Sequence, residues 1–318
     1  MAATTDNSQM AGLITTSIKR KFIPRLKNKL QFDPLAAKGK LEVRGGSKTL
    51  RWNLATDIGV YTTALGETTT TQNEVNTITI SSTLMTVSDY GAFLKMSDLA
   101  DSVWTRETRE EHADIFAFSG AKTRDTLLRN VADDTTTFFV SQETATGTGT
   151  LATTDTAIAQ DLNVIRGRFN QNDAEEFESL NGNYALIVHG KVEQDMVADV
   201  TTNRLSWSVL IQNVNPQAER ITNYKGPGAL LGVAVMRSNN ITTTTLTNTV
   251  TAYVNLALAD HGIGKTTLNQ SDPRIIMKRP GPSTVSVPLD TYGIIGWKMR
   301  MAQALLDNDR AIIYYSAI

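Results

Sequence analysis

Cysteine is absent from the 318-residue sequence, and only three histidines are present. The lack of cysteine excludes disulfides and thiolate metal sites and is typical of proteins that work in a cytoplasm. No run of about 18 apolar residues occurs, so we expect no transmembrane helix. The first residues are polar and precede the first basic cluster, which is the reverse of a secretory signal. We therefore expect a protein that is made in a cytoplasm and has no membrane partner.

Sites for chemistry are also scarce. None of His112, His189 and His261 stands at a metal-binding spacing from another histidine. Spacing alone leaves a Ser-His-Asp triad open, but the G-x-S-x-G motif of a nucleophile elbow is missing. Aromatic residues make up 7% of the chain and do not alternate with basic residues, which argues against a surface for single-stranded nucleic acid. We expect no catalytic residue, no metal and no cofactor, and therefore no enzyme.

One segment resembles part of a phosphate-binding loop. Gly264, Lys265 and Thr266 match the end of the motif, but the glycine required five residues before Gly264 is replaced by Ala259. We interpret the segment as a glycine turn after a strand, with a nucleotide-hydrolysing enzyme as the distant alternative.

Charge is unevenly distributed along the chain. The net charge is −1, yet residues 1–53 hold 11 Lys and Arg against 3 Asp and Glu. A basic arm on an acidic body can dock on a neighbouring copy or on a polyanion, and the alternative is a solvated tail. An acidic cluster at Asp173, Glu175, Glu176 and Glu178 lacks the residue order of a calcium loop, so we expect a solvated surface there.

Two segments near the N-terminus predict extensions that depend on another surface. Residues 19–35 predict a short basic helix with Phe22, Leu26 and Leu30 on one side, which is too little apolar surface for a stable isolated helix. Residues 39–92 predict a long two-stranded β excursion with a polar tip.

The rest of the chain mixes helices and strands. The longest helix is expected over residues 97–132, with Ser97 as N-cap and a kink or break in the polar stretch 105–112. Further helices are expected near 158–169 and 192–200. Strands are expected at 184–188, 230–237, 252–259, 274–278, 293–301 and 311–315. The mixed order predicts an α+β class with a separable middle block near 141–270.

Several short segments, taken in order, resemble one protein family. They are 22–30, 46–52, 90–99, 288–298, 304–306 and 309–310. Together they resemble the major capsid (coat) proteins of tailed bacteriophages, which have the Hong Kong 97 type of fold, and among these the coat proteins of phages like podovirus N-four. Val287 and Gly190 depart from the family pattern, which affects loop details and not the expected fold.

The resemblance implies the tailed-phage major capsid protein fold, divided into five parts along the chain. These are an N-terminal arm (1–45), an extended β loop (46–92), a peripheral domain with a long spine helix (93–140), an axial domain (141–270) and C-terminal strands that return to the peripheral domain (271–318).

The resemblance also implies self-assembly, through hexamers and pentamers, into an icosahedral phage head that encloses double-stranded DNA. The protein would be part of the virion and would be assembled in the host cytoplasm. Expected partners are other copies of the chain, a portal, scaffolding or decoration proteins, and packaged DNA contacted without sequence specificity. The alternative is an encapsulin-type cellular compartment on the same fold. A third interpretation, a β-rich tail or adhesion protein, is disfavoured by the long helix.

We expect contacts between copies to involve charged residues of the arm and of the extended loop. They are Lys19, Arg20, Lys21, Arg25, Lys27, Lys29, Lys48, Arg51 and Glu67.

Overall fold

The computed structural model describes residues 4–5, 30–40, 48–55, 80–99, 106–143, 151–198, 228–246, 249–267, 274–278 and 292–318. The helices are α2 (Phe32–Leu35), α4 (Arg106–Asp133), α5 (Asp161–Gln171) and α6 (Gly190–Ala198). Short 3-10 helices are η2 (Ser141–Glu143), η4 (Glu178–Leu180) and η6 (Asn308–Arg310). Across these ranges, no helix has the length and apolar character needed to cross a bilayer.

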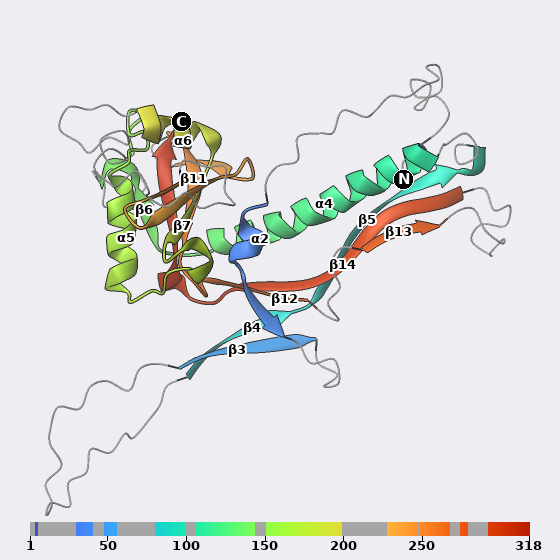
Figure 1. Cartoon of the computed structure of the whole chain (residues 1–318), viewed down its shortest axis with the longest axis horizontal. Helices are drawn as coiled ribbons and strands as arrows, with labels where there is room; N and C mark the ends of the chain where they lie inside the picture. The colour runs from blue at the N-terminus through green and yellow to red at the C-terminus, as the bar shows by residue number, and fades with distance from the viewer. Residues whose placement is uncertain are drawn as a thin grey trace, which may run out of the picture.

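The strands form two sheets and a separate hairpin (Figure 1). The long sheet has the order β1 (Thr4–Thr5), β5 (Ser88–Ser97), β14 (Tyr292–Leu305), β12 (Ile263–Thr267), β2 (Ala37–Lys40), with β13 (Arg274–Lys278) also paired to β14. The seven-stranded sheet has the order β6 (Phe138–Val140), β15 (Ala311–Ala317), β11 (Thr251–Leu258), β7 (Tyr184–Val188), β9 (Val233–Arg237), β8 (Gly228–Leu230), with β10 (Thr242–Thr245) beside β11. The hairpin joins β3 (Thr49–Ala55) to β4 (Ile80–Thr86).

The seven-stranded sheet is the centre of the larger core. Every residue of β7 is buried, as expected for a strand covered on both faces. One face packs against α5 and α6 through side chains such as Phe169 and Met196. The other face packs against α2 and the end of α4 through Phe32 and Leu128. This core fixes the place from which the other parts of the chain extend.

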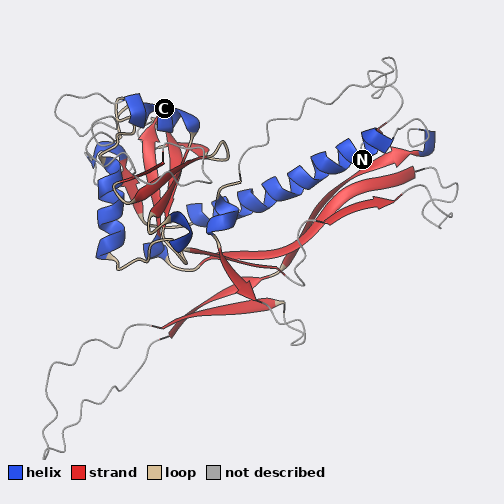
Figure 2. Cartoon of the chain, in the orientation of Figure 1, coloured by secondary structure: helices blue, strands red, loops and turns tan. Residues whose placement is uncertain are grey.

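The long sheet is covered on one face by α4, which runs beside it (Figure 2). Burial along β14 alternates accordingly, because Ile295, Trp297 and Met299 are buried while Lys298 is half-buried and Arg300 is exposed. No described element covers the opposite face of β5, β13 and the paired part of β14. That face is therefore a candidate surface for contact with another molecule.

The longest predicted helix is seen in two described parts. Ser97 ends β5 and pairs with Tyr292, and residues 98 and 99 directly after it are helical. Residues 100–105 lie outside the described residues, and over 106–112 the expected kink is wrong, because α4 is one helix from Arg106 onward. Arg, Glu and Ala are strong helix formers, so a polar stretch can continue a helix without help from a core.

Two other local predictions can be compared with the structure. The expected strand 230–237 is in fact β8 and β9, joined by a tight turn at Leu231 and Gly232, which have φ values of 54° and 79°. The expected β excursion is confirmed at its base, where β3 and β4 pair antiparallel from Thr49 opposite Thr86 to Ala55 opposite Ile80. Its tip lies outside the described residues, as do residues 19–29 of the helix predicted over 19–35. Of the remainder of that prediction, residues 30–31 are not helical and Phe32–Leu35 form α2.

Two strands bear on the expected division of the chain. β12 was expected in the middle block but pairs with β14 in the long sheet. β15 was expected to return to the peripheral domain, and it lies between β6, which is inside the expected range 93–140, and β11 of the middle block. Its sequence, AIIYYSA, is apolar at most positions and therefore suits the doubly covered sheet. The domain boundaries themselves stay a prediction.

Candidate interaction surfaces

The β3–β4 hairpin is anchored at its root and projects away from both sheets (Figure 1). Its root packs on β2 and β12, where two glycines make room for it. A Cβ at Gly264 would lie 2.5 Å from Met85 Cε, and one at Gly39 would lie 2.5 Å from Leu50 Cδ2. Met85 is consequently almost fully buried. The glycine of the segment that resembles a phosphate loop thus has a packing role.

The outer face of the hairpin exposes apolar side chains. Leu84 is 59% exposed and Ile80 is 60% exposed, and both lie on the face that also carries Arg51, which pairs directly with Leu84. Two large apolar side chains on a projecting hairpin are typical of a surface that another molecule covers.

The structure describes two of the nine residues predicted to contact other copies. Lys48 and Arg51 are both exposed at the hairpin root, and the carbonyl oxygen of Lys48 accepts a hydrogen bond from Val87 N at 2.9 Å. The other seven lie outside the described residues, so their predicted role stays a prediction: Lys19, Arg20, Lys21, Arg25, Lys27, Lys29 and Glu67. The exposed Leu84 and Ile80 were missed as contact residues, although both lie in the segment that predicted the β excursion.

An ion-pair cluster anchors the point where the N-terminal arm joins the body. Arg124 of α4 and Lys265 of β12 each donate to the Asp33 carboxylate at 2.8 Å. Lys265 also donates to the Asp33 carbonyl oxygen. Burial lowers the pKa of Lys265, and its contact with Asp33 opposes that shift. Lys265 is therefore engaged by a carboxylate, which leaves no room for the phosphate role that its motif suggested.

Asp125 holds the same junction from the helix side. Its Oδ1 accepts hydrogen bonds from Phe32 N at 2.9 Å and Asp33 N at 3.2 Å, and its Oδ2 accepts one from Asn240 Nδ2 at 3.2 Å. Burial raises the pKa of Asp125, and these hydrogen bonds act against the rise. One carboxylate thus satisfies the first N–H groups of α2 and links α2, α4 and the loop after β9.

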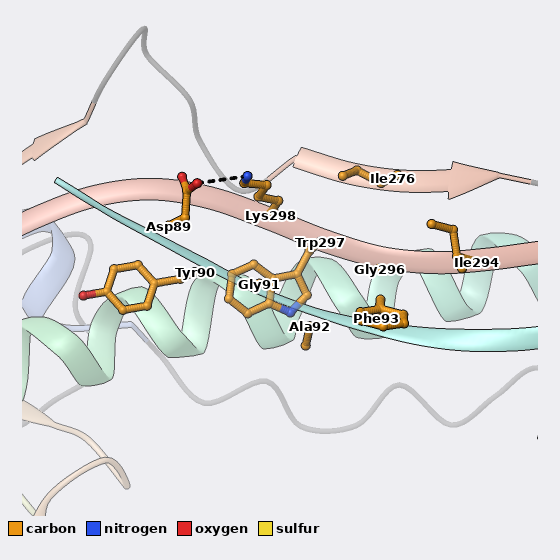
Figure 3. Close-up of a pocket in the computed structure, with 10 residues that line it drawn as sticks. All are labelled: Asp89, Tyr90, Gly91, Ala92, Phe93, Ile276, Ile294, Gly296, Trp297 and Lys298. Atoms are coloured by element: carbon orange, nitrogen blue, oxygen red, sulfur yellow. Dashed lines mark ion pairs between the residues drawn. The ribbon is translucent and has the colours of Figure 1, made fainter. Parts of the chain in front are cut away.

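The uncovered face of the long sheet carries an apolar hollow of about 290 Å³ (Figure 3). Phe93, Ile276 and Ile294 line it from three adjacent strands, and Phe93 is 64% exposed. Gly91 and Gly296 form its floor, since each lies on this face in the strand register. An exposed phenylalanine beside a hollow is a further sign of a contact surface.

Basic residues surround this hollow. In the register of β5, β14 and β13, five cations lie on the same face as Phe93: Lys95, Arg274, Lys278, Lys298 and Arg300. Asp89 is the one carboxylate of these strands on that face, and it pairs with Lys298 at 3.0 Å and Arg300 at 2.9 Å. The hydrogen bond from Lys298 is the main reason that the pKa of Asp89 is lowered. We call these six charged residues and the hollow the basic face.

The described residues also contain polar groups that resemble sites but have structural roles. His189 accepts a hydrogen bond from Lys191 N at 3.2 Å and stacks on Tyr253, so it completes a turn. Glu175, Asp260 and His261 lie close enough to hold a metal ion together. They are surface groups, and Arg310 lies 3.6 Å from Glu175, which disfavours a cation there.

A buried carboxylate lies under the seven-stranded sheet. Asp161 Oδ2 accepts hydrogen bonds from Tyr314 OH at 2.7 Å and Ser141 Oγ at 2.8 Å. Burial raises the pKa of Asp161 and raises that of Tyr314 well above its usual range. All three side chains are buried among the described residues, so we interpret the group as part of the core.

Comparison with known proteins identifies the fold. No protein-family model matches the sequence, and no curated protein matches it. Solved structures do match over nearly the full length. The capsid of the cyanophage P-SCSP1u is 13% identical with a TM-score of 0.66, covering 96% of this chain and 93% of its own. The capsid of Ralstonia phage GP4 is 12% identical with a TM-score of 0.65, and the match covers 95% of this chain and 98% of the phage chain.

A third match is the acid-stable capsid of the Helicobacter pylori bacteriophage KHP30. It is 12% identical with a TM-score of 0.64, and it covers 100% of this chain and 99% of its own. The chain therefore has the α+β fold of these phage capsid structures, as the sequence resemblance implied. The finer likeness to phages like N-four stays a prediction.

Proposed function

We propose that this chain is a major capsid protein, a structural subunit that assembles with copies of itself into a closed icosahedral shell. The observation that carries the proposal is the match in fold to phage capsids over nearly the whole of both chains. The projecting hairpin supports it, because its exposed apolar residues suit contact with a neighbour rather than an isolated monomer.

In the proposed shell, hexamers and pentamers repeat one head-to-tail contact that closes into rings. The hairpin, as the extended loop, lies on a neighbouring copy, and the arm adds contacts through its basic residues. The long sheet with α4 is the peripheral domain and the seven-stranded sheet is the axial domain. The shell encloses double-stranded DNA, forms in the host cytoplasm, and takes a portal and scaffolding or decoration proteins as further partners.

A hairpin substitution tests the proposal. Leu84→Asp and Ile80→Asp place a charge on the proposed contact, so we expect a folded subunit with at least about a tenfold loss of particles, because an unpaired charge in an interface costs several kcal/mol. Ser81→Asp is the control, since it adds the same charge at an exposed polar residue of β4 on the opposite face from Ile80 and Leu84. Negative-stain electron microscopy and sedimentation measure the particles.

The result that would contradict the proposal is an unaltered protein that remains monomeric at high concentration with no particles in any buffer. The encapsulin-type alternative is less favoured, because the matching structures are capsids of phages and of a GTA particle. Particles isolated from their natural source decide between the two: nuclease-protected double-stranded DNA supports the phage head, and an enclosed enzyme supports the compartment.

A further inference from the structure

Two exposed surfaces of opposite charge lie on different parts of the molecule. The basic face has five cations and one carboxylate around an apolar hollow. The segment between α5 and β7 carries four exposed carboxylates, at Asp173, Glu175, Glu176 and Glu178, which we call the acidic loop.

The two surfaces do not meet within one copy. The acidic loop follows α5 in the unit built on the seven-stranded sheet, whereas β13 and the basic face belong to the far stretch of the long sheet (Figure 1). Among the described residues, the ion pairs of the acidic loop are those of Glu175 with His261 and Arg310, and neither partner belongs to the basic face.

The acidic loop lies beside the hairpin. Glu175 lines the same hollow, of about 190 Å³, as Trp52 and Leu54 of β3. A neighbour that is touched by the hairpin is therefore also within reach of the acidic loop. This places the loop on the side of the subunit that is proposed to face the next copy.

We infer that the acidic loop of one copy docks on the basic face of the next copy. The inference rests on the proposed function, because it names a contact between subunits of the shell. Complementary charge steers the encounter and fixes the register of the two surfaces, while the hollow around Phe93 supplies apolar area that the contact removes from water. Since the two surfaces differ, the contact is heterologous and repeats head to tail.

Two charge-reversed variants test this contact. The first, Arg274→Glu with Lys278→Glu, reverses the charge of the β13 edge of the basic face, and the second, Glu176→Lys with Glu178→Lys, reverses the charge at two of the four carboxylates of the acidic loop. All four positions are exposed, so the fold is expected to survive. Lys122→Glu and Asp134→Lys, which are exposed and outside both surfaces, are matched controls.

Each variant alone brings like charges together, so we expect each to form particles or oligomers about tenfold less than the unaltered protein. An equimolar mixture restores both contacts, because each reversed surface then meets a complementary one. The variant that carries all four substitutions is expected to assemble alone. Sedimentation velocity, with a different fluorophore on each variant, measures the mixed oligomers.

Normal assembly of either variant alone, or a mixture of two folded variants that stays unassembled, would overturn the inference. If a double variant unfolds, Lys278→Glu and Glu178→Lys are mixed instead. If the unaltered protein forms no shell while the mixture still forms mixed oligomers, the proposed function fails and the contact stands. If the unaltered protein forms shells and each variant does too, the contact fails and the proposed function stands.

Discussion

Gly264 shows how one missing side chain determines the position of the hairpin. Met85 Cε and Leu306 occupy the space that a Cβ would need, at 2.5 Å and 2.9 Å. Any larger residue at this position would force the side chains of Met85 and Leu306 to shift.

Gly264→Ala is therefore expected to destabilise the subunit by about 1–3 kcal/mol, through overpacking. Gly167→Ala in α5 is the control, because nothing lies within 4 Å of its added Cβ. A glycine inside a helix costs about 0.5–1 kcal/mol relative to alanine, so the control should gain stability. Urea unfolding measures both variants, and equal stability of the two would contradict the packing account.

Asp161 makes the stability of the subunit depend on pH. Burial raises the folded-state pKa of its carboxyl above the unfolded value of about 3.9. The stability that it contributes is fully present below about pH 4 and is lost as the pH rises through its folded-state pKa.

Asp161→Asn is expected to remove this part of the pH dependence and to cost about 1–3 kcal/mol at low pH, because an amide N–H replaces an acceptor that faces several donors. Unfolding free energies between about pH 4 and 7 measure the slope. Asp125 and Asp133 also have raised pKa values, so part of the slope remains. An unchanged slope in Asp161→Asn, matching that of the exposed control Asp134→Asn, would refute the assignment.

Sequence reasoning at the scale of residues succeeded where a motif could be checked letter by letter. The phosphate motif was set aside because Ala259 breaks it, and a turn does follow β11 at residues 260–262, but Gly264, Lys265 and Thr266 themselves lie in β12 and not in the predicted turn. The partner of Lys265 could not be predicted, since Asp33 lies 232 positions away. Such a pair is decided by tertiary packing and leaves no local signal in the chain.

At the scale of elements, α2 has only four residues and depends on contacts outside itself. Asp125 accepts from its first N–H groups, and Phe32 and Leu35 fill the core beneath it. The end of the N-terminal arm is therefore held by α4 and not by its own helix propensity.

Asp125→Ala is expected to leave two backbone N–H groups and Asn240 without an acceptor, at a cost of about 1–3 kcal/mol. Limited proteolysis should then cut more rapidly between residues 30 and 40, while cleavage elsewhere is unchanged. Asp134→Ala, at an exposed position of the same chain segment, is the control. A cleavage pattern identical to that of the unaltered protein would show that packing alone holds α2.

Periodicity predicted most elements but not their ends. β7, β13 and the base of the hairpin match their expected residues, because apolar alternation or a fully apolar run is strong there. The helix expected from residue 97 is present at residues 98–99 and in α4 from Arg106, and the chain between them lies outside the described residues. The pairing of Ser97 with Tyr292, which places Ser97 in β5, could not be predicted because it joins distant parts of the chain.

At the scale of the whole molecule, two sheets share one continuous stretch of chain. β14 belongs to the long sheet, and β15 follows it directly through η6 into the seven-stranded sheet. The two units are therefore linked by strands that are neighbours in sequence, which couples their positions.

Removal of residues 1–29 is expected to leave this body folded, because the anchor at Asp33 and both cores lie outside the deletion. The same truncation is expected to prevent assembly, since it removes six basic residues of the arm that were predicted to contact neighbours. Thermal unfolding checks the fold and sedimentation checks the assembly. Truncated protein that builds normal shells would show that the arm is dispensable.

The pairing of β5 with β14 has a consequence for how the subunit is made. Arg300 and Asp89, which face each other across these strands, are 211 positions apart in the chain. Closing so long a loop is slow, and folding rates fall as contacts become less local. Until β5 and β14 pair, nascent chains expose unpaired strand edges that can associate with one another. The yield of soluble protein should therefore increase with expression at low temperature or with added chaperones.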